Sequence, residues 1–187
     1  MCIFGDLQNI CPIYLPFKYN IFDKKFMFVI FYVLHFFFLK NFLFFKKTHL
    51  IRFEMLCDLC CIDFPLKQER FVLLYIGLSI VFNKRINVKI FKQDKVCAFS
   101  LNFLFKNATW LEREVWDFFG IFFFYNLNIR RILLDYSFKG FPFRKDFPIS
   151  GFFELMYNMS KHFFSIKKLE KCQEFRNFIY ENVWNLI

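Results

Sequence analysis

The sequence predicts an α+β fold, with an antiparallel sheet packed with helices and followed by an extended C-terminal tail. Three observations carry this prediction. Between residues 55 and 103, short apolar segments alternate with polar turns, which is typical of β-strands. From residue 108 the apolar residues recur at helical spacing. Between residues 120 and 151, glycine, proline and mixed charges are too dense for a core and indicate an extended segment laid over a surface.

The first 49 residues form a Phe-rich region whose most apolar part is residues 26–45, FMFVIFYVLHFFFLKNFLFF. The uninterrupted part, residues 26–39, would span about 21 Å as a helix, whereas a hydrocarbon core needs about 30 Å. Extending it to residue 45 would place Lys40 and Asn41 in the membrane. The 35 phenylalanines in 187 residues indicate AT-rich codon bias, so hydropathy overstates membrane character. We expect a buried helix or strand pair here; a small mitochondrial membrane protein is the alternative.

Four strand-like segments follow, at residues 55–64, 70–82, 86–91 and 96–103. The last three are joined by short polar turns at residues 83–85 and 93–95. They predict an antiparallel meander, since strands joined by tight turns pair with their neighbours.

A helix is predicted from residue 108 to about residue 119. Thr109 and Glu112 have the spacing of a capping box, and Gly120 is placed to cap the C-terminal end. Arg113 and Asp117 lie four residues apart and are predicted to face away from the apolar side. That apolar side consists of Leu111, Val115, Phe118 and Phe119.

The predicted organisation has three regions. Residues 1–49 are the Phe-rich region, residues 50–124 are the α+β domain ending in the helix above, and residues 125–187 are the extended charged segment and a C-terminal amphipathic helix. That last helix is predicted past residue 168, from the spacing of Leu169, Cys172, Phe175, Ile179, Val183 and Leu186.

The formal net charge is +10, but Lys and Arg are spread over the whole length and interleave with Asp and Glu. This favours a basic surface that meets acidic proteins or a membrane surface over a nucleic-acid site. A basic organellar ribosomal protein is the second alternative. The first Arg is Arg52 and the first Ser is Ser79, so the start lacks the composition of a transit peptide. We expect a product made inside the organelle that uses it.

No catalytic, cofactor-binding or metal-binding residue is predicted. The seven cysteines are expected to be free thiols of a reducing compartment, buried within strands. Cys57 and Cys60 have CxxC spacing without a second pair, and the three histidines show no ligand pattern. There is no G-x-G-x-x-G, P-loop or H-E-x-x-H motif. The acidic residues near the start of the helix suit its dipole rather than acid–base catalysis.

Two stretches, EREVWDFFGI at residues 112–121 and RRILLDYSFKGFPFRKDFPISG at residues 130–151, resemble the signature of the thirty-kilodalton subunit family of respiratory complex I, in its mitochondrion-encoded form. Residues 57–65 and 70–91 are also similar to the strand region of that family. The resemblance covers about residue 50 to the C-terminus, while the first fifty residues match only weakly.

The resemblance implies a structural core subunit of the peripheral arm of complex I, on the matrix side of the mitochondrial inner membrane. The complex would be NADH:ubiquinone reductase coupled to proton translocation, and this chain would be a non-catalytic scaffold of the quinone-reducing module. The chain would hold no cofactor, while iron–sulfur clusters, FMN and ubiquinone belong to the complex. Its partners would be the 49 kDa-type subunit and other peripheral-arm subunits, without nucleic acid.

The alternating charges of this signature suit charge-assisted hydrogen bonds to a partner. The alternative is that they pair internally and hold the segment against its own domain. The predicted interface comprises Glu112, Arg113, Glu114, Asp117, Gly120, Arg130, Arg131, Asp135, Tyr136, Gly140, Pro142, Arg144, Lys145, Asp146 and Pro148.

Overall fold

The computed structural model describes residues 17–19, 28–33, 38–49, 51–170, 174 and 176–178. By its internal contacts the chain divides into two compact units, Met1–Asp146 and Phe147–Ile187. The predicted divisions after residues 49 and 124 stay predictions.

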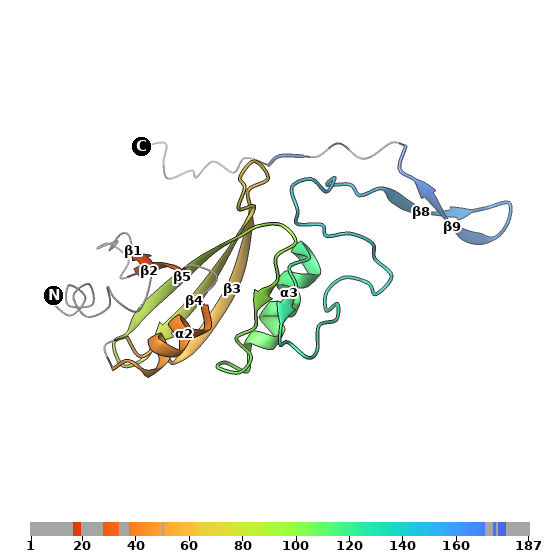
Figure 1. Cartoon of the computed structure of the whole chain (residues 1–187). Coiled ribbons are helices and arrows are strands. Elements are labelled where there is room, and N and C mark those ends of the chain that lie inside the picture. Colours follow the sequence, from red (N-terminus) through yellow and green to blue (C-terminus); the bar gives the residue numbers. More distant parts are fainter. Residues whose placement is uncertain are drawn as a thin grey trace, which may run out of the picture. The chain divides into compact units, whose positions relative to one another are not determined.

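The first unit is built on a five-stranded sheet in the order β1-β2-β5-β4-β3 (Figure 1). Its strands are β1 (Phe17–Tyr19), β2 (Phe28–Val33), β3 (Met55–Asp63), β4 (Phe71–Ser79) and β5 (Lys84–Lys92). The pairs β3–β4, β4–β5 and β1–β2 are antiparallel, and β2–β5 is parallel. This confirms the α+β fold and the strands predicted near residues 55–64, 70–82 and 86–91.

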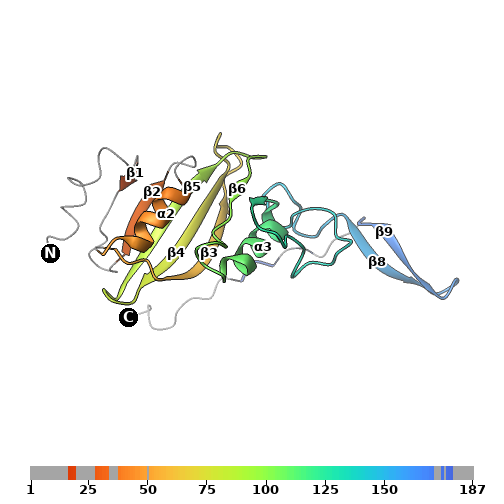
Figure 2. The same ribbon diagram turned by 60° about the horizontal axis from the view of Figure 1, so that its bottom comes forward.

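One face of the sheet is covered by aromatic residues from helix α2 (Phe38–Lys47), which lies over the strands in Figure 2. The rings of Phe42 and Tyr75 lie 5.2 Å apart, and those of Phe42 and Phe53 lie 5.8 Å apart, both edge to face. Phe42, Phe45 and Phe53 are fully buried. A Cβ at Gly77 of β4 would overlap the Phe53 ring, so this strand position needs glycine.

The described part of the 26–45 stretch contributes the strand β2 and the short helix α2, and Phe42 and Phe45 of this helix are buried in the core as expected. Among the described residues, no helix combines the length and apolar character that crossing a membrane requires.

The prediction of a fourth strand at residues 96–103, as the last strand of the meander, is wrong. Only β6 (Ala98–Phe99) forms within residues 96–103, and it pairs in parallel with β7 (Phe123–Phe124) rather than with β5. Leu101 is fully buried and the chain turns there, with the N–H groups of Leu104 and Phe105 donating to its carbonyl. The burial of this side chain, not strand pairing, explains the apolar pattern.

Helix α3 (Ala108–Phe119) forms where the spacing predicted, but the predicted capping box is wrong. The cap residue is Asn107, whose side-chain amide donates to the Leu56 carbonyl of β3 at 2.6 Å. The Thr109 hydroxyl donates to the Asn102 side chain at 2.6 Å. Arg113 and Asp117 are buried rather than facing solvent.

The cysteine prediction is correct in part. Cys57, Cys60 and Cys61 lie in β3 without a disulfide, but Cys57 is exposed and the other two are half-buried. Burial is the main cause that raises the pKa of Cys60 to about 11 and that of Cys61 to about 12. Both thiols are therefore poor nucleophiles at neutral pH. Cys2, Cys11 and Cys172 lie outside the described residues.

The second unit contains a hairpin of β8 (Phe153–Asn158) and β9 (Phe163–Lys168), which the sequence did not predict. The predicted C-terminal helix falls mostly on residues that the structure does not describe, and its described residues 169, 170, 174 and 176–178 are not helical.

The buried Lys92 at the end of β5 is expected to make stability depend on pH. Its ammonium donates to the Val96 carbonyl at 3.3 Å, and burial lowers the pKa of Lys92 to about 7 although the neighbouring Cys97 opposes the change. The folded state thus disfavours the charged form, so the free energy of unfolding should rise as the pH increases from about 7 toward the ordinary value of 10.5. Lys92→Met should be more stable than wild type by about 1–3 kcal/mol at pH below 7, with a difference that shrinks above it.

Urea unfolding of the full chain across this pH range measures the effect. Lys95→Met, at an exposed position in the following turn, is the matched control and should change stability little. If Lys92→Met raised the free energy of unfolding equally at both ends of the pH range, the lowered pKa of Lys92 would not be the cause.

Candidate partner interface

The charged segment after α3 starts at a glycine that reverses the chain. Gly120 has φ 75° and its N–H donates to the Trp116 carbonyl at 2.9 Å, which confirms the predicted C-terminal cap. A Cβ at this position would lie 2.5 Å from the ring of Phe141, which returns from the far end of the segment. Glycine is therefore needed both for the turn and for the close approach of this ring.

We expect Gly120→Ala to lower the free energy of unfolding by about 1–3 kcal/mol, because alanine is strained at this φ and its methyl group displaces Phe141. Gly151→Ala is the matched control, since it has the same φ of 75° but nothing within 4 Å of its Cβ position. Urea unfolding of the two variants separates the backbone strain at this φ, which both share, from the displacement of Phe141, which occurs only in Gly120→Ala. An equal loss in both would mean that the contact with Phe141 contributes nothing.

Asp117 of α3 is the main anchor of the segment. Its side chain is fully buried, and one carboxylate oxygen accepts the N–H groups of Ile132, Leu133 and Leu134 at 3.2, 2.9 and 2.9 Å. The other oxygen accepts from the Arg131 guanidinium at 2.8 Å. Burial alone would raise the pKa of Asp117, but these donors outweigh it and hold the pKa below its ordinary value. The carboxylate is thus saturated by its own chain.

Arg131 connects this anchor to the rest of the segment. Besides the bond to Asp117, its guanidinium donates to the Gly140 carbonyl at 3.2 Å. Its central carbon lies 5.6 Å from the ring centroids of Trp116 and Phe141 and 5.7 Å from that of Phe138. An arginine held by a carboxylate and aromatic rings is a rigid fixture.

Glu112, one turn earlier, joins the opposite side of α3 to the chain around β6 and β7. Its buried carboxylate accepts from the Ser100 hydroxyl at 2.6 Å, the Leu101 N–H at 2.7 Å and the Asn126 amide at 2.9 Å. Burial nevertheless raises the pKa of Glu112. Glu112 and Asp117 therefore fix the polypeptide on both sides of the helix.

Two further arginines bind backbone carbonyls, one after α3 and one at its C-terminal end. Arg113 donates to the Arg130 carbonyl at 3.2 Å, and its guanidinium lies 4.9 Å from the Trp110 ring. Arg144 donates to the Phe119 carbonyl at 2.6 Å, which is one of the carbonyls that the helix leaves without an intrahelical partner.

The end of the segment is attached to the sheet by a network around Arg70. Its guanidinium donates to both oxygens of Asp63, at 2.7 and 2.8 Å, and lies 3.0 Å from Asp146. Asp63 also accepts the Lys145 N–H at 2.9 Å. The bonds to Arg70 are the main reason why the pKa values of Asp63 and Asp146 lie below their ordinary range. Sequence reasoning missed Asp63 and Arg70, which were seen only as strand ends.

The predicted interface residues thus separate into those that are buried or half-buried and those that are exposed. Glu112, Arg113 and Asp117 are buried and bind their own chain, and Arg131 and Arg144 are half-buried and do the same. Gly120, Gly140, Pro142 and Pro148 are also half-buried. Exposed members are Glu114, Arg130, Asp135, Tyr136, Lys145 and Asp146. Internal pairing, the alternative for these charges, is what the structure shows; contact of the exposed members with a partner stays a prediction.

The segment is fastened by its charges but leaves large apolar side chains in solvent. Leu127 is 98 % exposed and Tyr136 is 77 % exposed, and Leu133 and Phe143 are also mostly exposed. One face of Phe143 stacks on Phe118, with ring centroids 4.1 Å apart. Rigid backbone with exposed apolar side chains is what a protein-binding surface requires.

Comparison with known proteins decides the family. The model of the family described as "Respiratory-chain NADH dehydrogenase, 30 Kd subunit" matches residues 37–153, well over half of the chain. The chain belongs to this family. The matched range covers both sequence motifs, at residues 112–121 and 130–151, and the strands β3 to β6 that precede them.

Several relatives agree with this membership. NADH-ubiquinone oxidoreductase subunit 9 of Reclinomonas americana is 45 % identical over 136 residues, which are 73 % of this chain and 67 % of that protein. The subunit 9 of Prototheca wickerhamii is 39 % identical over 151 residues, or 80 % and 79 % of the two chains. NADH dehydrogenase (ubiquinone) iron-sulfur protein 3 of Solanum tuberosum is 41 % identical over 141 residues, or 75 % and 74 %.

The fold has a counterpart among solved structures. A chain of the membrane-bound sulfane sulfur reductase, an archaeal respiratory membrane complex, matches with a TM-score of 0.65 and 22 % identity, over 79 % of this chain and 84 % of that one. At this identity the match shows the fold alone.

As a 30 kDa subunit family member, the chain is a peripheral-arm subunit of complex I, and the enzyme in which it takes part is NADH:ubiquinone oxidoreductase. The prediction of the family and of this role is confirmed, in place of the membrane-protein and ribosomal alternatives. Its partners are therefore other subunits of the complex. The expected mitochondrial location agrees with these relatives. Within the described residues, no group of three His, Cys, Asp or Glu is arranged to hold a metal ion.

Proposed function

We propose that the chain is a non-catalytic scaffold of the quinone-reducing module, which binds the 49 kDa-type subunit on the matrix side of the inner membrane. The family resemblance implies this partner and place. The buried charges support the scaffold role, because Glu112 and Asp117 are saturated by groups of their own chain and serve to hold backbone. Cofactors of the complex would lie in other subunits.

The observation that carries the proposal is the apolar face of the β8–β9 hairpin. The strand register puts Leu155 opposite Ile166 and Tyr157 opposite Phe164. Phe153 shares this face, and all five side chains are exposed. Lys168 lies opposite Phe153 on this face. The other face pairs Glu154 with Lys167, Met156 with Ser165 and Asn158 with Phe163, so it is more polar.

A two-stranded hairpin with an uncovered apolar face is marginal in water. This hairpin has one face suited to burial and one suited to solvent, which is the pattern of a strand pair that packs against another protein. The partner would supply an apolar surface that covers this face.

The proposal is tested by native-gel separation of the complex, an NADH activity stain and mass spectrometry of the band. Ile166→Ser should lower the amount of assembled complex, while Lys167→Ser, one residue later on the polar face, should leave it near the wild-type level. Turnover per assembled complex should be the same in both. Normal assembly with slow turnover in Ile166→Ser, or a redox centre in the purified chain, would refute the scaffold role.

A further inference from the structure

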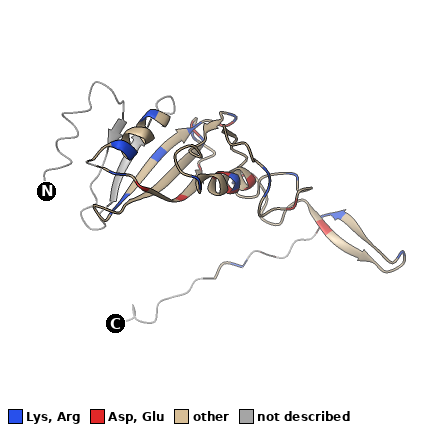
Figure 3. Cartoon of the chain, turned by 90° about the horizontal axis from the view of Figure 1, so that it is seen from below, with Lys and Arg blue, Asp and Glu red and all other residues tan. Residues whose placement is uncertain are grey.

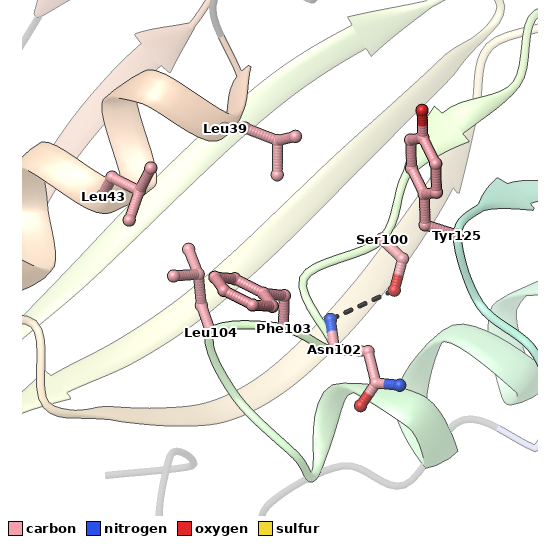
Figure 4. Close-up of a pocket in the computed structure, with 7 residues that line it drawn as sticks. All are labelled: Leu39, Leu43, Ser100, Asn102, Phe103, Leu104 and Tyr125. Carbon is pink, nitrogen blue, oxygen red and sulfur yellow. Dashed lines mark hydrogen bonds between the residues drawn. The ribbon is translucent and has the colours of Figure 1, made fainter.

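A groove on the first unit, away from the charged segment, carries an inference beyond this role. It lies between α2 and the turn after β6 and has a volume of about 530 Å³. Figure 4 shows Leu39 and Leu43 projecting from α2 on one side, and Phe103 and Leu104 from the turn on the other. Tyr125, at φ 66°, lines the far end.

The groove is apolar because its polar lining atoms are used inside the protein. The Ser100 hydroxyl donates to Glu112, and the Asn102 carbonyl oxygen accepts from Thr109. Phe103 is 93 % exposed, although its neighbours Leu101 and Phe105 are buried. Large apolar side chains placed beside an open groove on a rigid base are typical anchors of a protein interface.

Among the described residues, the charged side chains that flank the groove walls in sequence are lysines. Lys47 follows Leu39 and Leu43 at intervals of four residues, so it lies on the same side of α2, and Lys46 is its neighbour. The Lys46 ammonium donates to the Leu104 carbonyl at 2.6 Å across the end of the groove. Lys106 follows on the opposite wall, and α2 itself carries no acidic residue (Figure 3).

These lysines lack acidic neighbours. Residues 38–53 and 95–111, which supply both walls, contain no Asp or Glu. In the described part of the chain, none of the ion pairs includes Lys40, Lys46, Lys47 or Lys106. Uncompensated like charges around an apolar groove favour a ligand with apolar side chains flanked by carboxylates.

We propose that this groove docks an acidic amphipathic segment of another complex I subunit. One apolar side chain of that segment fills the space between Leu43 and Phe103, and its carboxylates pair with Lys46, Lys47 and Lys106. A helix is the form that fits best, since apolar and acidic residues at intervals of three and four present both features on one side. The proposal rests on membership of the complex but not on the β8–β9 hairpin that carries the proposed function.

Zero-length carbodiimide cross-linking of the intact wild-type complex tests it, because the reagent joins an amine only to a carboxyl group in direct contact. Mass spectrometry should find Lys47 or Lys106 linked to Asp or Glu of a different subunit. Lys47 should also be acetylated more slowly in the complex than in the isolated chain. Lys67, an exposed lysine in the turn after β3, is the control whose acetylation should not change. Equal acetylation of Lys47 in both samples, without cross-links, would overturn the proposal.

A variant pair tests the apolar part. Phe103→Ser should weaken retention of the cross-linked subunit about tenfold or more, as for an interface anchor. Leu66→Ser is the matched control, since Leu66 is 100 % exposed and lies in a different turn. If the complex with Phe103→Ser retains every subunit, the docking proposal is overturned and the scaffold role stands. If the wild-type chain is absent from the complex, the scaffold role itself is refuted.

An anionic lipid could use the same chemistry, and the experiment distinguishes it. Protection of Lys47 that disappears when detergent removes lipid, without any cross-link to protein, would identify a lipid site and overturn the protein partner. Protection that survives delipidation supports the protein partner.

Discussion

Asp117→Asn is expected to lower the free energy of unfolding of the full chain by about 3–5 kcal/mol. The carboxylate of Asp117 accepts three backbone N–H groups and the Arg131 guanidinium within a fully buried site. An asparagine amide has one acceptor oxygen, and its NH₂ group would point at other donors. The substitution therefore leaves the Arg131 guanidinium without its anion, and the amide NH₂ group faces either this guanidinium or the three backbone N–H groups.

Urea unfolding followed by circular dichroism measures this loss. Glu114→Gln is the matched control, because Glu114 lies on the same helix but is exposed, and a surface change of this kind costs less than about 0.5 kcal/mol. A loss for Asp117→Asn as small as that of the control would show that the segment is held by other contacts.

The same substitution should act on assembly. Asp117 fixes the backbone of residues 132–134, and Arg131 in turn binds the Gly140 carbonyl. Loosening these bonds frees the segment that presents Leu133 and Tyr136. Because the entropy of ordering this segment would then be paid on binding, we expect less assembled complex and the normal turnover per assembled complex.

The strands and the position of α3 were predictable because they depend on local patterns. The alternation of Ile86, Val88 and Ile90 is visible in the sequence and survives in the structure, although the turn before it lies at residues 80–83 instead of the predicted 83–85. The cap at Gly120 was predictable for the same reason, since it depends on one residue and its φ. Family membership rested on many fixed positions at once, so no single substitution could hide it.

The roles of the charged residues were not predictable because they depend on residues distant in sequence. Glu112 has the spacing of a capping box with Thr109, but Ser100, Leu101 and Asn126 supply better donors in a buried site. Asp63 and Arg70 looked like strand ends, and nothing local indicates that Asp146 meets them from 76 residues beyond Arg70. Tertiary contacts of this kind overrule the local pattern.

Internal pairing changes what the motif means for function. The charges of residues 112–146 were expected to grip a partner, yet the buried ones bind the chain's own backbone. Their contribution to assembly is therefore indirect: they hold exposed apolar side chains in place. Charge in this segment supplies rigidity, and we propose that exposed residues such as Leu127, Leu133 and Tyr136 supply the contact area.

Arg70→Ala should lower the free energy of unfolding by about 3 kcal/mol, because it leaves Asp63 buried without its cation. The side chain of Asp63 is 1 % exposed, and both of its oxygens accept from Arg70. Arg52→Ala is the matched control. Arg52 pairs with Glu54 at 3.6 Å, but their side chains are 44 % and 31 % exposed, and solvent-accessible pairs of this kind contribute about 0–1 kcal/mol. Adding Asp63→Asn to Arg70→Ala should restore part of the loss, since the buried charge is then removed.

The pH dependence separates this electrostatic cost from lost packing against Phe71. The pKa of Asp63 is held below its ordinary value of 3.8 mainly by Arg70, so the stability that the pair contributes is fully present above pH 3.8 and is lost as the pH falls through the folded-state pKa. The gap between wild type and Arg70→Ala should therefore be wide at neutral pH and narrow in acid. A gap that stays constant down to about pH 3 would mean that Arg70 stabilises the chain through its contact with the Phe71 ring rather than through Asp63.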